Sequence, residues 1–368
     1  MRSRALRGNQ KANEAVGGLS SPPHMHGQAL RALFPGGTHM TNLNLPRRKF
    51  LLLAASAAAL PSAPHIARAQ AYPDRPVRLV VPQAAGSASD IFARLIGQWL
   101  SERLGQQFII ETRPGAGGNV GTEAVVRAPA DGYTLLLVNS QNAISATVYD
   151  KLNFNFVRDI APVAGIIRLP LVMEVNPSVP AKTIPEFITY AKANPGQIAL
   201  ASAGSGGPQH VSGELFKMMA GINMLHVPYR GSTPALTDLL AGQVQIMFDV
   251  LPSSLPHIRA GRLRPLAATT AARLDVMPDI PTVAEFLPGY EASAWIGLGA
   301  PRATDVEIVD KLNHEVNAAL ADPKIRARLA ELGGTVLLAG SRADFGKHIA
   351  DETEKWGKVV RFASIKPE

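Results

Sequence analysis

The chain has 368 residues, of which 46% are hydrophobic and 18% are charged, and it contains no cysteine. This composition excludes a wholly disordered chain, and the length corresponds to two ordinary domains or one large one. Without cysteine there is no disulfide, thiolate metal site or cysteine nucleophile. The net charge of +8 comes from residues 1–71, which hold nine of the 37 Lys and Arg residues and one of the 29 acids. Residues 72–368 are therefore neutral.

Residues 40–71 have the pattern of a secretory signal peptide. Arg47, Arg48 and Lys49 precede an apolar run from Leu51 to Leu60, and small residues follow it. The run is shorter than the roughly 20 residues that a membrane-spanning helix needs. Two A-x-A sequences predict cleavage near residues 69–71 and export of the mature chain.

The arginine pair is typical of a twin-arginine signal, but Pro46 stands where Ser or Thr is usual, which leaves the Sec route open. Residues 1–39 lack any signal-peptide pattern. We therefore expect Met40 to be the start of the protein and residues 1–39 to be an upstream extension, and the sequence leaves open whether they are translated.

Short apolar strands alternate with amphipathic helices along the mature chain. The predicted strands are 77–82, 108–111, 134–138, 171–175, 198–201, 225–227, 244–248 and 296–300. The predicted helices include 91–104, 305–321, 323–332 and 343–360, and helices that end near residues 219 and 240. Capping boxes predict further helix starts at Thr183, Thr282 and Ser341.

This alternation predicts parallel sheets covered by helices, in an α/β fold with two doubly wound domains around a cleft. An irregular stretch at 149–165 precedes the strand at 171. We therefore expect 72–170 and 296–368 to form domain 1, and 171–295 to form domain 2. Ligands of such sheets bind in the strand-to-helix loops. Those loops are rich in Gly, Ala and Ser here, which favours an anion held by main-chain N–H groups.

The segment Ala203-Gly204-Ser205-Gly206-Gly207 resembles the nucleophile elbow G-x-S-x-G and stands between a predicted strand and helix. A hydrolase would also need an acid and a histidine in later loops. Asp249 and His257 have that order but are only eight residues apart. A serine that donates a hydrogen bond to a ligand is the favoured interpretation, and the hydrolase is the alternative.

The mature sequence contains no motif for metal, nucleic-acid or dinucleotide binding. The mature histidines at 210, 226, 257, 314 and 348 lack metal-site spacing, and the basic residues are balanced by acids. The glycines between 115 and 121 miss the dinucleotide spacing by one position, and a structural turn explains them better. We therefore expect no metal, no cofactor and no nucleic-acid partner.

Seven segments in order carry a family resemblance. They are YPDRPVR (72–78), ETRPGAGGN (111–119), ADGYTL (130–135), GELFK (213–217), HVPYRGS (226–232), DLLAGQV (238–244) and LPSSLPHI (251–258). With them, the chain from Tyr72 to Lys366 resembles the Bug-type receptors, the periplasmic solute-binding proteins of tripartite tricarboxylate transporters. The pattern covers the whole mature chain.

The resemblance implies a periplasmic, monomeric, two-domain receptor without catalytic activity. Its cleft would take a small carboxylate, an organic acid or amino acid, and hold the oxygens with main-chain N–H groups, small hydroxyls and waters. The implied partners are the membrane permease subunits of a tripartite transporter, or a membrane kinase if the receptor is a sensor. Neither the identity of the carboxylate nor the choice between transport and sensing follows from the sequence.

The family's first ligand loop reads roughly Pro-Phe-x-x-Gly-Gly-x-x-Asp. In this chain Pro82, Gly86 and Asp90 match it, whereas Gln83 replaces the aromatic residue and Ser87 replaces a glycine. Both departures favour a ligand with additional polar groups. The ligand-binding residues that the resemblance implies are Gln83, Ala84, Ala85, Gly86, Ser87, Ser89, Asp90, Ser140, Asn142, Ser202, Ala203, Gly204, Ser205, Gln209, Tyr229 and Asp249.

Overall fold

The computed structural model describes residues 72–149, 151–333 and 336–367. The predicted signal peptide and upstream extension lie outside these residues. Among the residues described, no helix combines the length and apolar character that crossing a membrane requires.

The described chain is built on one ten-stranded sheet with the order β2-β1-β3-β9-β4-β7-β5-β6, in which β8 and β10 also pair with β4. The strands are β1 (Val77–Val81), β2 (Phe108–Thr112), β3 (Thr134–Asn139), β4 (Ile160–Val175), β5 (Ala199–Ser202), β6 (Leu225–Pro228), β7 (Ile246–Val250), β8 (Arg264–Ala268), β9 (Ser293–Pro301) and β10 (Val336–Leu337).

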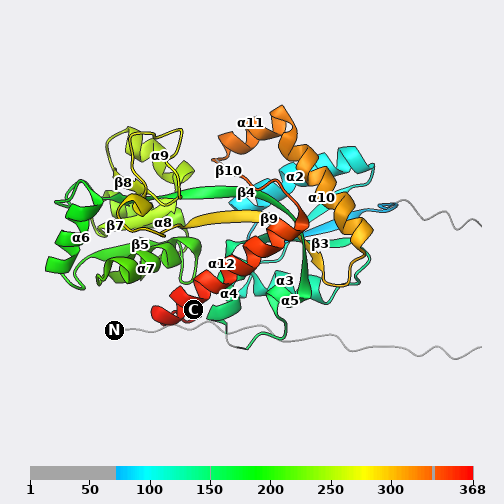
Figure 1. Ribbon diagram of the computed structural model, residues 1–368, viewed down its shortest axis with the longest axis horizontal. Coiled ribbons are helices and arrows are strands. Elements are labelled where there is room, and N and C mark those ends of the chain that lie inside the picture. Colours follow the sequence, from blue (N-terminus) through cyan, green and yellow to red (C-terminus); the bar gives the residue numbers. More distant parts are fainter. Residues whose placement is uncertain (1–71, 150, 334–335, 368) are drawn as a thin grey trace, which may run out of the picture. The chain divides into compact units, whose positions relative to one another are not determined.

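Helices cover the sheet on both faces (Figure 1). They are α2 (Ala88–Leu104), α3 (Asn119–Val126), α4 (Ser140–Val148), α5 (Phe156–Asp159), α6 (Ile184–Ala193), α7 (Pro208–Ala220), α8 (Ser232–Leu240), α9 (Leu251–Arg259), α10 (Val306–Ala321), α11 (Pro323–Glu331) and α12 (Arg342–Phe362), with short 3-10 turns at Ala116–Gly118 and Val283–Glu285. The α/β fold class is thus confirmed.

Two long strands, β4 and β9, join the two ends of the sheet (Figure 1). At one end β1 is parallel to β2 and β3, and at the other β5 is parallel to β6 and β7. The prediction of parallel sheets is wrong for the centre, because β4 runs antiparallel to β7 and β9, and β9 runs antiparallel to β3.

The predicted irregular stretch at 149–165 is wrong from residue 156, where α5 and then β4 begin, and the prediction of a fresh strand at 171 is wrong. β4 is one 16-residue strand from Ile160 to Val175. The strand was not predicted because Pro162 and Gly165 lie within it, and these residues usually interrupt strands. The structure accommodates them at two register shifts, one between Pro162 and Ala164 and one between Gly165 and Ile167.

The predicted binding residues were expected in strand-to-helix loops, and this expectation needs correction at two places. Residues 139–142 do not form a loop. Asn139 caps α4, and its side-chain oxygen accepts a hydrogen bond from Gln141 N–H. Asp249 does not lie in a loop either, since it belongs to β7, and α9 follows from Leu251. The predicted N-caps at Thr183 and Ser341 are confirmed, whereas Thr282 opens only a 3-10 turn.

The centre of the sheet is packed so closely that glycine is required on β9. A Cβ atom on Gly297 would lie 2.1 Å from Phe345 Cζ on α12 and 2.6 Å from the Ala164 carbonyl oxygen. The main chain of β4 cannot retreat without losing ladder hydrogen bonds. The position therefore fixes the distance between β9, β4 and α12.

We predict that Gly297→Ala lowers the free energy of unfolding by about 1–3 kcal/mol, the usual cost of overpacking a core. Gly340→Ala is the matched control, because its new Cβ would come no closer than 3.4 Å to any atom. Urea unfolding of the two variants measures the difference. Equal stability of Gly297→Ala and the wild type would contradict the packing argument.

Candidate functional site

A cavity of about 330 Å³ lies where loops from the two ends of the sheet meet. The β1–α2 loop contributes Pro82, Gln83 and Ala84, and the segment after β2 contributes Pro114, Gly115, Gly117 and Gly118. The remaining lining residues are Gln141, Val148, Tyr149, Ala203, Gly204, Ser205, Gly207 and Pro367. We call this space the candidate cavity. Its described lining residues include no Asp, Glu, Lys, Arg or His, so a bound anion would meet polar groups and not a countercharge.

Gln83 is held in place from the first side of the cavity. Its side-chain oxygen accepts a hydrogen bond of 2.7 Å from Asn139 Nδ2, which also lies 3.2 Å from Ser89 Oγ. Asn139 is itself fixed as the cap of α4, because Asn142 Oδ1 accepts its main-chain N–H. The Gln83 side-chain oxygen thus already accepts a hydrogen bond from Asn139, and the NH₂ group of Gln83 is the part that would donate to a ligand.

The opposite side of the cavity is formed by residues 203–207, which we call the Ser205 loop. It leads from β5 into α7, whose N-cap Gly207 supplies no side-chain hydrogen bond. Gly204 and Gly206 have positive φ angles of 143° and 66°, which glycine tolerates best. Main-chain N–H groups at such a helix start favour an anion.

A hydrogen bond between Gln141 and Gly206 links the two sides directly. Gln141 Nε2, on α4, donates to the carbonyl oxygen of Gly206 at 2.9 Å. Gln141 also donates to Ser145 Oγ on its own helix at 3.1 Å. The position of the Ser205 loop relative to α4 therefore depends on the Gly206 peptide.

Of the predicted binding residues, Gln83, Ala84, Ala203, Gly204 and Ser205 line the candidate cavity. Those that do not line it are Ala85, Gly86, Ser87, Ser89, Asp90, Ser140, Asn142, Ser202, Gln209, Tyr229 and Asp249. Two of them, Ser87 and Asp90, stabilise the start of α2. Ser87 Oγ accepts from Asp90 N–H, and the Asp90 carboxylate accepts from Gly86 N–H and pairs with Arg94. The Gly86 hydrogen bond, with help from Arg94, outweighs burial and lowers the pKa of Asp90.

Three of the predicted binding residues form hydrogen bonds to other protein groups near α7, β6 and β7. They are Gln209, Tyr229 and Asp249. Asp249 Oδ1 accepts from Ser232 Oγ at 2.9 Å and from Gln209 Nε2 at 3.4 Å. The Tyr229 hydroxyl donates to Asp238 at 2.7 Å, and burial together with this contact raises its pKa to about 12. These contacts leave the roles of the three side chains in ligand binding as predictions.

The sequence analysis missed several lining residues, chiefly Gln141, Tyr149, Pro367 and the glycines after β2. The glycines were attributed to a structural turn, although they stand in a strand-to-helix loop like the others. That position was the available signal. Gln141 stands between the predicted binding residues Ser140 and Asn142, in a segment that was expected to be a ligand loop, whereas Pro367 carried no comparable signal.

Two buried carboxyl groups lie on the paired strands β4 and β7. Glu174 on β4 and Asp249 on β7 are both fully buried, and Glu174 Oε1 accepts from Ser254 Oγ at 2.7 Å. Glu174 Oε2 and Asp249 Oδ2 have no hydrogen-bond partner among the described residues. Burial raises the pKa of both groups, and for Glu174 the charge of Asp249 adds to it.

We predict that Glu174→Gln stabilises the fold at pH 7, by about 1 kcal/mol or more, because it removes the cost of a buried charge. A carboxyl group with a raised pKa in the folded state stabilises most below its unfolded pKa, and this contribution is lost as the pH rises. The advantage of the variant should therefore vanish near about pH 4. Urea unfolding across pH tests this, with the exposed Glu102→Gln as control. A pH-independent difference would contradict it.

Comparisons with known proteins agree with this architecture. The family described as "Tripartite tricarboxylate transporter family receptor" matches residues 92–365. The protein BugT of Bordetella pertussis is 36% identical over 301 residues, which cover 81% of this chain and 92% of BugT.

Two solved structures are similar over almost their whole length. R. palustris Rpa4515 with adipate is 39% identical with a TM-score of 0.71, covering 81% of this chain and 100% of that one. MatC from Rhodopseudomonas palustris with bound malate is 33% identical with a TM-score of 0.67, covering 78% of this chain and 100% of that one. The resemblance stated from the sequence is confirmed, and the chain belongs to the receptor family of the tripartite tricarboxylate transporters.

Proposed function

We propose that this chain is an extracytoplasmic solute-binding protein that captures a small carboxylate and delivers it to the permease subunits of a tripartite transporter. The observation that carries the proposal is the candidate cavity, where two strand-to-helix loops place small residues and main-chain N–H groups around an uncharged space. Its volume of about 330 Å³ suits a small acid. The adipate and malate in the related structures support this ligand class.

The same cavity would serve a sensor that reports its ligand to a membrane kinase, and we keep this as the second candidate. Export follows from the predicted signal peptide and supports a periplasmic location. The hydrolase interpretation loses support, because Ser205 and His257 line different cavities and Asp249 is bonded to Ser232 and Gln209. The receptor family to which the chain belongs points to binding and not to catalysis.

We predict that adipate or malate raises the melting temperature of ligand-stripped mature protein, whereas ATP, glucose and zinc do not. A ligand that binds only the folded state adds about 2.7 kcal/mol at a hundredfold excess over its Kd. For a chain of this size that is a rise of several degrees in a thermal scan. A shift with glucose or ATP, and none across a wide panel of carboxylates, would contradict the proposal.

The matched variants for this experiment are Ser205→Ala and Ser178→Ala. Ser205 lines the cavity, and losing one hydrogen bond to a charged oxygen should weaken binding roughly tenfold. Ser178 lies after β4, bonded to Asn176, and its replacement should leave affinity unchanged. Calorimetry with the stabilising acid gives both values. Unchanged affinity in Ser205→Ala would remove Ser205 from the binding site.

We also propose that 72–170 with 296–368, and 171–295, move as two domains about the central strands β4 and β9. The register shifts in β4 near Pro162 and Gly165 fall on the part of the strand that pairs with β9. Hinge closure about a few such positions is the usual motion of a two-domain receptor.

The expected result is a smaller radius of gyration when a saturating acid is added. Small-angle scattering of the mature protein, with and without the acid that raises its melting temperature, measures this change. An unchanged radius at saturation would show a rigid cavity and contradict the proposed domain motion.

A further inference from the structure

Two histidines stack directly beneath the Ser205 loop. The rings of His210, on α7, and His226, on β6, have centroids 3.5 Å apart and planes within 5° of parallel. His210 is only 5% exposed. Sixteen positions separate the two residues in the sequence, so the pairing is visible only in the fold.

The hydrogen bonds of His210 fix its protonation. Its Nδ1 accepts a 3.0 Å hydrogen bond from the main-chain N–H of Gly206. A main-chain N–H can only donate, so Nδ1 carries no proton in this arrangement. The ring is therefore neutral, with its proton on Nε2, which faces Glu214 Oε1 at 3.6 Å.

The second ring supports the start of the same loop. His226 Nε2 lies 2.7 Å from Ser202 Oγ, which also lies 3.0 Å from the Gly204 carbonyl oxygen. On the other face of the Gly206 peptide, the carbonyl accepts from Gln141. The Gly206 peptide is thus held between His210 and the far side of the candidate cavity.

We propose that His210 is a positioning residue of the ligand site, which holds the Ser205 loop only while its imidazole is neutral, so that acidification releases the loop. The effect on bound carboxylate rests on the proposed function, whereas the effect on the loop does not. A proton on Nδ1 removes the only acceptor that this contact offers to Gly206 N–H. The peptide must then turn away or leave a buried donor unpaired.

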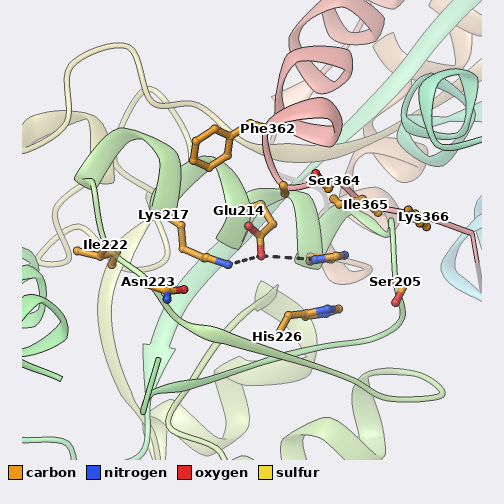
Figure 2. Close-up of a pocket in the computed structure, with 12 residues that line it drawn as sticks. Ser205, Glu214, Lys217, Ile222, Asn223, His226, Phe362, Ser364, Ile365 and Lys366 are labelled. Atoms are coloured by element: carbon orange, nitrogen blue, oxygen red, sulfur yellow. Dashed lines mark hydrogen bonds and ion pairs between the residues drawn. The ribbon is translucent and has the colours of Figure 1, made fainter. Parts of the chain in front are cut away.

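Water can reach the pair through a second cavity, which shares Ser205 with the candidate cavity. A second cavity of about 560 Å³ is lined by both histidines, Glu214, Lys217 and the chain end from Phe362 to Lys366. Figure 2 shows the charged end of Lys217 directed at Glu214, with Ser364, Ile365 and Lys366 also lining this cavity. Solvent protons therefore have access to the pair.

The charged groups around the pair oppose one another. Glu214 favours the protonated ring of His210, but its carboxylate is shared with Lys217 at 2.8 Å. Lys217 and Lys366 disfavour a further positive charge, and so does a proton on the stacked ring of His226. The charged side chains that line the cavity beside the pair are thus Glu214, Lys217 and Lys366.

The sign of the pH dependence follows from linkage. While Gly206 N–H donates to His210 Nδ1, that nitrogen carries no proton, whereas it can bind one once the loop is released. The released state therefore binds one proton more, and acid favours it. Affinity for a carboxylate should then fall as the pH is lowered, by at most about tenfold per pH unit for one proton.

The first test needs no ligand. Nuclear magnetic resonance of the ¹⁵N-labelled mature protein follows the His210 ring nitrogens and the Gly206 amide as the pH falls. We expect an unprotonated Nδ1 at neutral pH, and exchange protection of the Gly206 amide that is lost when Nδ1 becomes protonated. In His210→Asn, whose Oδ1 can accept the bond but does not titrate, protection should persist in acid. The exposed His314→Asn should behave as the wild type.

Protection of Gly206 that does not follow Nδ1 in the wild type would overturn the proposal, even if His210→Asn failed to fold. A protonated Nδ1 at neutral pH would also overturn it.

The second test measures the affinity for adipate between pH 8 and pH 5 by calorimetry, with the range set by imidazole titration. The wild type and His314→Asn should lose affinity steeply, while His210→Asn should show a flatter profile. Equal slopes would overturn the link to binding. If no carboxylate binds at any pH, the proposed function fails, and the resonance experiment alone still decides whether His210 holds the loop.

Discussion

The antiparallel pairing of β4 with β9 is the constraint on which the rest of the structure depends. β4 pairs with β9 on one side and with β7 and β8 further along, and β9 pairs in turn with β3. This pair therefore connects the two ends of the sheet that carry the loops of the candidate cavity. The absence of a side chain at Gly297 lets Phe345 of α12 approach the sheet closely. The relative position of the Gln83 and Ser205 loops is thereby set at the centre of the molecule, far along the chain from either loop.

The outer strands and most helices could be predicted from the sequence, because their apolar residues follow regular strand and helix periods. The central strand β9 could be predicted as well, but the greater part of β4 could not. In β4 the period is broken by Pro162, Gly165 and Pro170, and the residues still extend because β9 supplies the pairing. Asp249 gave the opposite error. An acid after an apolar run looks like a loop residue, but here it stays in β7 with Ser232 and Gln209 as partners.

The candidate site was predicted at the level of loops more than of side chains. Gln83 and Ser205 line the cavity. Ser87 and Asp90, which belong to the same loop motif as Gln83, instead accept main-chain hydrogen bonds at the N-terminus of α2. Helix capping and anion binding use the same small polar residues for the same main-chain donors, so the sequence alone does not separate them. Gln141 contributes through its position opposite Gly206, which only the folded chain reveals.

The chain contains three tryptophans, and their positions determine which parts of the molecule intrinsic fluorescence reports on. Trp295 on β9 and Trp356 on α12 are fully buried and donate to the same oxygen of Glu352, at 3.1 and 2.8 Å. Trp99 on α2 donates to the Glu315 carbonyl of α10. None of the three lines the candidate cavity. Fluorescence from Trp295 and Trp356 therefore reports on β9 and α12, and a spectral change from these two residues on adding a solute would indicate movement there and not contact with the solute.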